Sequence, residues 1–325
     1  MNLATSYLGL KLRSPLIVGA SPFCDDVHRA LQLQDAGAAA LVMRSLFEEQ
    51  IEPAPLVPPP EREPVPPGSD NPEFADYQFS PEQYLRQLRQ LKRALTIPVI
   101  ASLNGRHPGP WLDFGRQLQD AGAAAIELNF YQVVTDVTVA ADEVECEMLR
   151  VVGDLAAAID IPIAVKLSPY HTTVAQLAVA LELAGAAGVV IFNRFYQPDI
   201  DPDELAVQPQ LRLSDPGELL LRLRWLAILS PQLRGSLAAT GGIHSGAGVA
   251  KSLLAGAHAV QLVSILLKEG PHMLTVIARD LQAWMARHGF TDLESFRGRL
   301  NLHRCQDPAA FERANYIRLL QSWIV

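Results

Sequence analysis

The sequence is poor in cysteine. Cys24, Cys146 and Cys305 are its only cysteines, and no two of them form a C-x-x-C pair. An odd number of widely spaced cysteines argues against a disulfide framework and against a zinc or iron–sulfur site. We therefore expect a cytoplasmic protein without a metal centre.

Basic charge and long hydrophobic runs are also lacking. The formal net charge is −8, whereas affinity for nucleic acid or anionic lipid needs a basic surface. No apolar run approaches the roughly 20 residues of a membrane span, and the opening residues do not have the pattern of a signal peptide. We therefore expect a small-molecule partner, with no nucleic acid and no membrane.

A repeated pattern organises the rest of the chain. Each copy reads as a helix end, a glycine stop and a short apolar run, which is typical of a parallel strand buried on both faces. The copies are "LQDAGAAALVMRS" from Leu33, "LQDAGAAAIELNF" from Leu118, "LELAGAAGVVIFN" from Leu181 and "LLAGAHAVQLVS" from Leu253.

Four further apolar runs lie between these copies: "SPLIVGAS", "IPVIASLNG", "IPIAVKLSP" and "GSLAATGGI". Eight strands then alternate with eight helices, which predicts an α/β fold, a (β/α)8 TIM barrel forming one domain over residues 1–325. An open doubly wound sheet is the competing arrangement. In a barrel, the polar residues at the strand ends converge on one active face.

Two segments fall outside the repeat. Residues 53–72 are too rich in proline for a helix or central strand, and they form either a polyproline excursion or a lid or subunit contact. The tail, residues 290–325, contains "FERANYIRLLQSWIV", an amphipathic helix candidate that packs on the barrel or on a second subunit. We expect a homodimer.

The strongest local signal for a ligand is "ATGGIHSG". Gly241 and Gly242 follow a strand, and the next helix starts near Ser245. Glycines allow backbone N–H groups to approach an anion, and a helix N-terminus adds partial positive charge. The pattern predicts a phosphate site to which Ser264 adds a hydroxyl. Alternatively, the glycines only make a tight turn.

Polar residues at other strand ends indicate a planar ligand. Lys166 ends an apolar strand and is a Schiff-base nucleophile, a phosphate ligand, a cation beside a flavin, or the partner of a structural carboxylate. The amides of Asn129 and Asn193 suit a ring with mixed donor and acceptor edges. Arg194 holds a substrate carboxylate or pairs with Asp199 or Asp201.

These motifs, in this order, resemble the dihydroorotate dehydrogenase family of FMN-dependent TIM barrels. The resemblance rests on "SPLIVGAS", "ELN", "AVKLSP", "VIFN", "ATGGIHSG" and "AGAHAVQLVSILLKEGP", and it spans about Ser14 to Pro271. "SLFEEQI", "NRFYQPDID" and "DPAAFERANY" are most similar to the bacterial branch usually labelled dihydroorotate dehydrogenase-like.

The resemblance implies oxidation of dihydroorotate to orotate in pyrimidine biosynthesis, with hydride transfer to N5 of FMN. Lys166 and Asn129 are the implied catalytic residues, with Lys166 stabilising charge on the reduced flavin. The implied substrate contacts are Asn104, Asn129, Asn193 and Arg194. The implied FMN contacts are Ala20, Ser21, Arg44, Ser45, Asn129, Lys166, Asn193, Gly241, Gly242 and Ser264.

Several positions depart from the family pattern. Arg44 stands where lysine is common, Val263 stands where glycine is usual, and "LRLSDPGE" replaces a Gly-Gly pair. Most importantly, Gln132 occupies the position of the cysteine or serine base, and Val134 that of a later asparagine. An amide is not a general base at neutral pH.

Neighbouring residues offer weak replacements for the base: Thr135 and Asp136 foremost, then Tyr131, Cys24 and His107. The missing base leaves three alternatives open. The chain is a flavoprotein with another substrate, a non-catalytic flavin-binding protein, or an FMN-free phosphate-binding aldolase or lyase in which Lys166 forms a Schiff base.

Overall fold

A computed structural model describes residues 1–51, 79–107, 109–208 and 211–322. The proline-rich stretch 53–72 lies outside these residues. Within the described part, no helix is long and apolar enough to cross a membrane.

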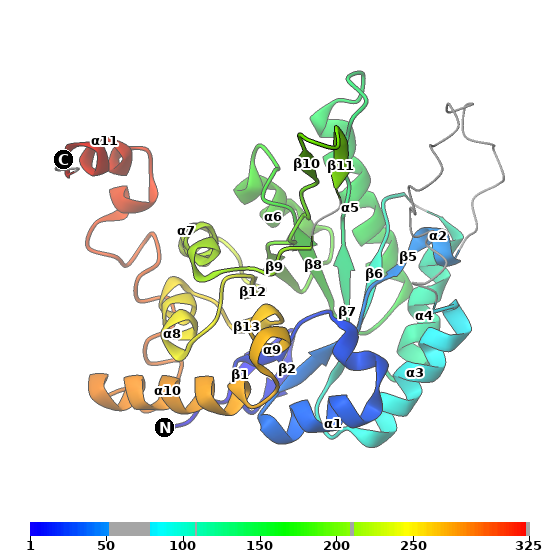
Figure 1. The fold of residues 1–325 in the computed structure, drawn as a ribbon, viewed down its shortest axis with the longest axis horizontal. Helices are drawn as coiled ribbons and strands as arrows, with labels where there is room; N and C mark the ends of the chain where they lie inside the picture. Colours follow the sequence, from blue (N-terminus) through cyan, green and yellow to red (C-terminus); the bar gives the residue numbers. More distant parts are fainter. Residues whose placement is uncertain (52–78, 108, 209–210, 323–325) are drawn as a thin grey trace.

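The centre of the structure is a closed barrel of parallel strands, as the sequence predicted (Figure 1). Each strand pairs with its neighbours along the chain, and β13 pairs with β3 to close the ring, so the strand ends share one face. The barrel strands are β3 (Leu16–Val18), β4 (Ala40–Val42), β6 (Val99–Asn104), β7 (Ala125–Asn129), β8 (Ile163–Leu167), β9 (Gly188–Ile191), β12 (Ser236–Thr240) and β13 (Ala259–Leu262).

Helices surround this barrel. Gly37 and Gly256 end their helices with φ of 118°, in the left-handed region that the repeat predicted. A capping box at Ser80 and Gln83 starts the helix after the proline-rich stretch. The helices are α1 (Val27–Ala36), α3 (Pro81–Ala94), α4 (Asp113–Asp120), α5 (Ala141–Ala158), α6 (Val174–Leu183), α7 (Leu219–Leu229), α8 (Gly246–Ala255), α9 (Ser264–Glu269) and α10 (Met273–His288).

Side chains alternate along each strand between the barrel interior and the helical layer. At the amino-terminal end, alanines such as Ala125, Ala164 and Ala259 leave room, and the buried ring of Tyr7 packs among them. Tyr7 belongs to a hairpin of β1 (Thr5–Tyr7) and β2 (Leu10–Leu12) that the sequence reading missed. Tyr7 therefore fills the amino-terminal end of the barrel interior, whereas polar side chains lie at the carboxyl end.

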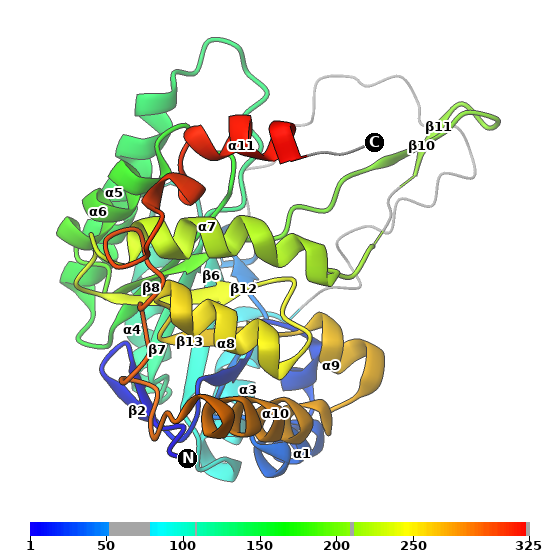
Figure 2. The ribbon, with the colours of Figure 1, turned by 90° about the vertical axis from the view of Figure 1, so that its left-hand side faces the viewer.

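Additional elements decorate the carboxyl end of the barrel. β5 (Leu46–Phe47) and α2 (Glu48–Ile51) follow β4, and a hairpin of β10 (Asp199–Asp201) and β11 (Ala206–Gln208) follows β9. Figures 1 and 2 place this hairpin and α11 (Ala314–Ser322) on the side opposite the N-terminus. The helical part of the predicted tail is confined to η5 (Pro308–Phe311) and α11.

Candidate active site

The ends of β6 and β7 carry a buried hydrogen-bonded layer around Asn129. Asn129 Nδ2 lies 2.9 Å from Ser102 Oγ and 3.2 Å from Ser45 Oγ, and the two hydroxyls are 2.8 Å apart. Asn129 Oδ1 accepts no hydrogen bond from the described residues. The side-chain amide of Asn104, the neighbour of Asn129 on β6, makes no hydrogen bond with them either. The layer fixes Asn129 and leaves its carbonyl for a ligand.

Lys166 sits beside this layer on β8, and its ammonium already has an anionic partner. Lys166 Nζ is 3.2 Å from Glu127 Oε1 and 3.4 Å from Gln261 Oε1, and Gln261 Nε2 donates to Glu127 Oε2. Of the options left open for Lys166, the pairing with a structural carboxylate is therefore present. Glu127 and Gln261 are each only 1% exposed.

This buried network has a physical reason for its composition. A charge inside a protein is tolerated only when it is paired and hydrogen-bonded. The network leaves Lys166 with one N–H to offer a ligand, because two of its three protons face Glu127 and Gln261. Burial, followed by the charge of Glu127, raises the pKa of Tyr7.

The loop after β12 has the shape expected for an anion site. Gly241 and Gly242 have φ of 87° and 78°, and a Cβ on Gly242 would lie 2.4 Å from the backbone N of Leu219. A Cβ on Gly241 would lie 2.9 Å from Nη2 of the buried Arg222. Glycine is thus required at both positions for steric and conformational reasons. Ser245 caps α8, as predicted.

Ser264 joins this loop through a residue that sequence reasoning missed. Ser214, from the "LRLSDPGE" segment, places its Oγ 2.8 Å from Ser264 Oγ and accepts from Gly242 N at 3.2 Å. The backbone N of Ser214 also donates to Ser264 Oγ. The only sequence signal for Ser214 was the missing Gly-Gly pair, which did not identify a serine as its replacement.

Two other family departures have local explanations. Arg44 donates through Nη2 to Asp25, a partner that its guanidinium reaches from the end of β4. Gly19 leaves room for Val263, because a Cβ on Gly19 would lie 2.9 Å from Val263 Cγ2.

Asn193 and Arg194 lie after β9, but they have different surroundings. Asn193 Nδ2 is 3.4 Å from the carbonyl of Lys166, which keeps it with the buried layer. Arg194 pairs at 3.3 Å with Glu218, which also pairs with Arg222. The alternative prediction, that Arg194 pairs with Asp199 or Asp201, was therefore wrong.

The loop that carries the base in the family is largely exposed here. Val133 is 67% exposed, and Thr135 is exposed as well. Asp136 Oδ1 accepts from the N and Oγ1 of Thr138, which lowers the pKa of Asp136. A low pKa makes this carboxylate a weak base.

Tyr131, the remaining candidate in this loop, makes an aromatic contact instead. Its ring stacks on Phe195 with centroids 4.2 Å apart, and its hydroxyl accepts from the N of Tyr196. The residue therefore ties the β7 loop to the β9 loop.

The distant base candidates also have other roles. Burial, followed by the charge of Asp25, raises the pKa of the Cys24 thiol to about 12, so little thiolate forms at neutral pH. His107 Nδ1 is 3.3 Å from Glu48 Oε1 on α2. Cys24 is therefore not set up as a base, and His107 is tied to α2.

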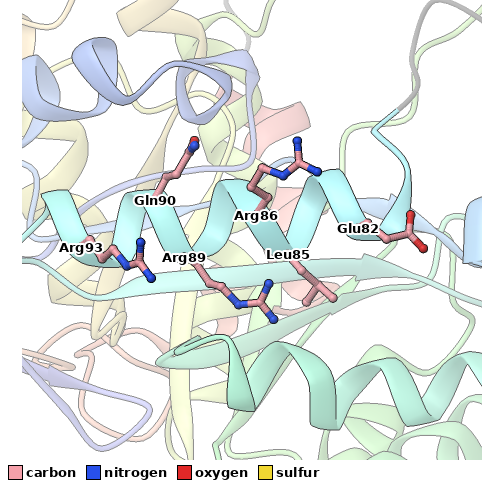
Figure 3. A pocket seen from close by; sticks show the side chains of 6 residues that line it. All are labelled: Glu82, Leu85, Arg86, Arg89, Gln90 and Arg93. Atoms are coloured by element: carbon pink, nitrogen blue, oxygen red, sulfur yellow. The ribbon is translucent and has the colours of Figure 1, made fainter.

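A hollow elsewhere is unrelated to these residues. It has a volume of about 430 Å³ and is lined, among the described residues, by Glu82, Leu85, Arg86, Arg89, Gln90 and Arg93. Figure 3 shows that all of these side chains come from α3, on the outside of the barrel. The hollow therefore does not belong to the strand-end site.

Comparison with known proteins decides the family. The model of the family described as "Dihydroorotate dehydrogenase" matches residues 78–285, which include Asn129, Lys166 and the glycine loop. The chain belongs to this family. The resemblance and the TIM barrel expected from the sequence are thereby confirmed.

Several curated relatives extend the likeness across the chain. A putative dihydroorotate dehydrogenase A (fumarate) of Aeropyrum pernix is 28% identical over 91% of this chain and 97% of its own length. The catalytic subunit of dihydroorotate dehydrogenase B (NAD(+)) of Thermoplasma acidophilum is 24% identical over 91% and 98%. The NAD-dependent dihydropyrimidine dehydrogenase subunit PreA of Escherichia coli is 26% identical over 68% and 57%.

Proposed function

We propose that this family member is an FMN-dependent oxidoreductase that oxidises dihydroorotate, or a related cyclic dihydro-amide, at a CH–CH bond. The observation that carries the proposal is that Asn129 and Lys166 lie side by side in the register of the adjacent strands β7 and β8. Gly241 and Gly242 lie at the same face of the barrel. An amide, a cation and an anion-binding loop suit the three parts of FMN: the ring edge, its electron-rich side and the phosphate.

The donor set of this face fits FMN. The hydroxyl of Ser21 is buried and has no hydrogen-bond partner among the described residues, which is a cost that a bound ligand removes. The glycine loop has the close backbone approach that phosphate needs. Asn104 and Asn129 Oδ1, which make no side-chain hydrogen bond among the described residues, add amide groups that a ligand can use. Ala20, Ser45 and Asn193 complete the proposed contacts.

In this proposal, bound FMN supplies a hydride acceptor. Lys166 holds a fixed positive charge on the reacting side, and Glu127 and Gln261 keep its ammonium in place. Asn129 and Asn193 orient the amide edges of the substrate by hydrogen bonds. Arg194 binds a carboxylate only by sharing or leaving Glu218. No described residue holds the proton-accepting role that the family assigns to cysteine or serine.

A second candidate function follows from Gln132 and the exposed loop around it. A flavoprotein that receives hydride directly, as from a reduced nicotinamide, needs no base to remove a proton from an adjacent carbon. Other dihydropyrimidines are candidates on a separate ground, since a similar protein is named as a dihydropyrimidine dehydrogenase subunit, and their CH–CH oxidation needs a proton acceptor as that of dihydroorotate does. This alternative keeps FMN and changes the substrate.

The experiment that tests both functions is a cofactor spectrum followed by anaerobic titration. We expect yellow protein whose flavin absorbance is bleached by dihydroorotate. Flavin that stays oxidised with dihydroorotate, but is bleached by NAD(P)H or another dihydropyrimidine, supports the second function. Flavin that no reductant bleaches indicates a non-catalytic binding protein.

Colourless protein after mild purification would overturn both functions. In that case, borohydride trapping of a carbonyl substrate on Lys166, absent from Lys166→Ala, would identify a Schiff-base aldolase or lyase. The two assays therefore separate all the alternatives that the sequence left open.

We further propose that the protein is a homodimer. α11 exposes Tyr316, Ile317, Leu319 and Leu320, each more than half accessible, and an apolar surface of this kind favours a protein contact. Sedimentation should give a dimer, and Leu319→Glu with Leu320→Glu should shift it toward monomer. A monomeric wild-type protein would refute the proposal.

A further inference from the structure

The segment 211–218, "LRLSDPGE", places a buried polar group where the family usually has a glycine pair. Ser214 is 2% exposed, although it lies in a loop before η4 (Pro216–Glu218). Its Oγ contacts Gly242 N and Ser264 Oγ, and it is 3.5 Å from His244 Nε2. Chain segments far apart in sequence thus meet at one hydroxyl.

The hydrogen bonds of the two serines determine which hydroxyl proton is free to bind a ligand. Ser264 Oγ accepts from the backbone N of Ser214, and Ser214 Oγ donates to it when Gly242 N donates to Ser214. The proton of Ser264 is then left without an acceptor among the described residues. A ligand that accepts hydrogen bonds completes this arrangement.

Backbone donors point to the same ligand. Among the described residues, the N–H groups of Ile243 and His244 donate to no acceptor, although Ile243 is only 3% exposed. Buried N–H groups without partners are rare in proteins. They follow the glycine turn in which Gly242 N already donates to Ser214 Oγ, and successive N–H groups of this kind are typical of an anion-binding loop.

Lys268 adds a cation to this group. Its Nζ donates to the carbonyl of Ser214 at 3.0 Å, and it makes no ion pair among the described residues. Burial, followed by the charge of Lys268, lowers the pKa of His244, so its imidazole is neutral at pH 7. The carboxylates that face His244 are Asp215 and Glu269, and neither contacts the serines.

We propose that this chain holds the terminal phosphate of FMN through the free hydroxyl proton of Ser264, which Ser214 orients, together with the ammonium of Lys268 and the glycine loop. This inference rests on the proposed function. Lys268 keeps its contact with Ser214 O and turns its remaining protons to the phosphate.

The test compares FMN with riboflavin, which has the same ring system but no phosphate. Dissociation constants are measured by quenching of flavin fluorescence for wild type, Ser214→Ala and Lys268→Met. Lys251→Met, an exposed lysine on the neighbouring α8, is the matched control. Ser214→Ala and Lys268→Met should each weaken FMN binding by about tenfold to hundredfold, because the first misdirects and the second removes a charge-assisted hydrogen bond to the phosphate.

Riboflavin binding and the Lys251→Met protein should change by less than about twofold by the same reasoning. Equal losses for FMN and riboflavin, or tighter FMN binding by Ser214→Ala, would overturn the assignment. The second result would mean that Ser214 competes with phosphate. If Ser214→Ala does not fold, as judged by its melting curve, the exposed Lys268→Met protein decides the question.

Inorganic phosphate separates this inference from the proposed function. If wild-type protein binds neither flavin, the flavin function fails, and calorimetric titration with phosphate decides the site alone. Phosphate binding that Ser214→Ala and Lys268→Met abolish keeps the assignment. Absence of phosphate binding to wild type overturns it.

Discussion

The stretch Ile126–Asp136 contains two regions that differ in almost every physical property. Up to Asn129, its residues belong to β7 and are buried. From Tyr131 to Asp136 the chain forms no helix or strand, and Val133 is 67% exposed. Asn129 is held by two serine hydroxyls from other segments, whereas Asp136 is held only by its own turn.

This difference explains why the family resemblance divides at Asn129. A strand-end residue is constrained by the barrel, because every change in its position disturbs neighbours on both sides. A loop residue is free to change without loss of the fold, so substrate chemistry can change there. The proposed cofactor contacts lie on the constrained side, and the missing base lies on the free side.

The largest expected effect comes from a buried residue at a strand end. Lys166→Met leaves Glu127 buried without its cation, which should lower the free energy of unfolding by about 3–5 kcal/mol. Urea denaturation measures this change. Arg116→Ala, which breaks the exposed pair with Asp113, is the control and should cost less than about 1 kcal/mol. Equal losses for the two variants would remove the contrast.

The second prediction adds a serine hydroxyl to the exposed loop after β7. If dihydroorotate is the substrate, Gln132→Ser should raise kcat, by up to about a hundredfold, because a general base contributes at least that much. Stopped-flow bleaching of the flavin by dihydroorotate measures the rate. Gln132→Ala is the control, since it removes the amide without adding a hydroxyl. A rate unchanged by serine would favour a substrate that needs no base.

A third prediction concerns the amino-terminal end of the barrel, opposite the site. Burial, followed by the charge of Arg297, lowers the pKa of His258 from 6.5 to about 4, and His258 Nδ1 accepts from Leu237 N. Because the unfolded chain binds the proton more readily, His258 contributes stability fully above pH 6.5, and this contribution is lost as the pH falls toward 4.

The amount lost by His258 should be about 3 kcal/mol at most. Urea denaturation at pH 7 and pH 4.5 measures it, and His258→Gln should flatten the dependence relative to wild type. The same pH dependence in both proteins would mean that other groups cause the acid sensitivity. A flattened dependence would assign the acid sensitivity of folding to the barrel rather than to the loop after β7.

The smallest effect compares the two regions within one stretch. Asn129→Ala should cost about 1–3 kcal/mol, because it removes a buried amide that donates to Ser102 Oγ and to the carbonyl of Leu103. Asp136→Asn, in the exposed turn, should change the free energy of unfolding by less than about 0.5 kcal/mol. Thermal melts of the two variants give both values, and a larger loss from Asp136→Asn would contradict the division at Asn129.

Much of the fold was predictable from local patterns. The glycine stops at Gly37, Gly122, Gly185 and Gly256 all have φ of 98–118°, because a helix end before a buried strand needs the left-handed region that glycine adopts most easily. The strand ends followed from the apolar runs. The positions of Asn129, Lys166, Gly241, Gly242 and Ser264 at or just after strand ends were therefore predicted from the sequence.

The partners of these residues were not predictable in the same way. Gln261 meets Glu127 from 134 positions away, and Ser214 meets Gly242 from 28 positions away. Glu127 did have a signal, since it lies two residues before Asn129 and therefore points to the same side of β7. Tyr7 had none, because nothing in its local pattern indicates which cavity its ring fills.

The sequence by itself thus determined the barrel and its polar face and predicted, through the family resemblance, a glutamine in place of the usual base, because periodicity, glycine stops and residue identity are local properties. Only the tertiary structure decided that Lys166 has a buried counter-ion and that Ser214 enters the glycine loop. These contacts depend on closing the ring of strands, which brings β13 across from β7 and the 211–218 segment beside β12.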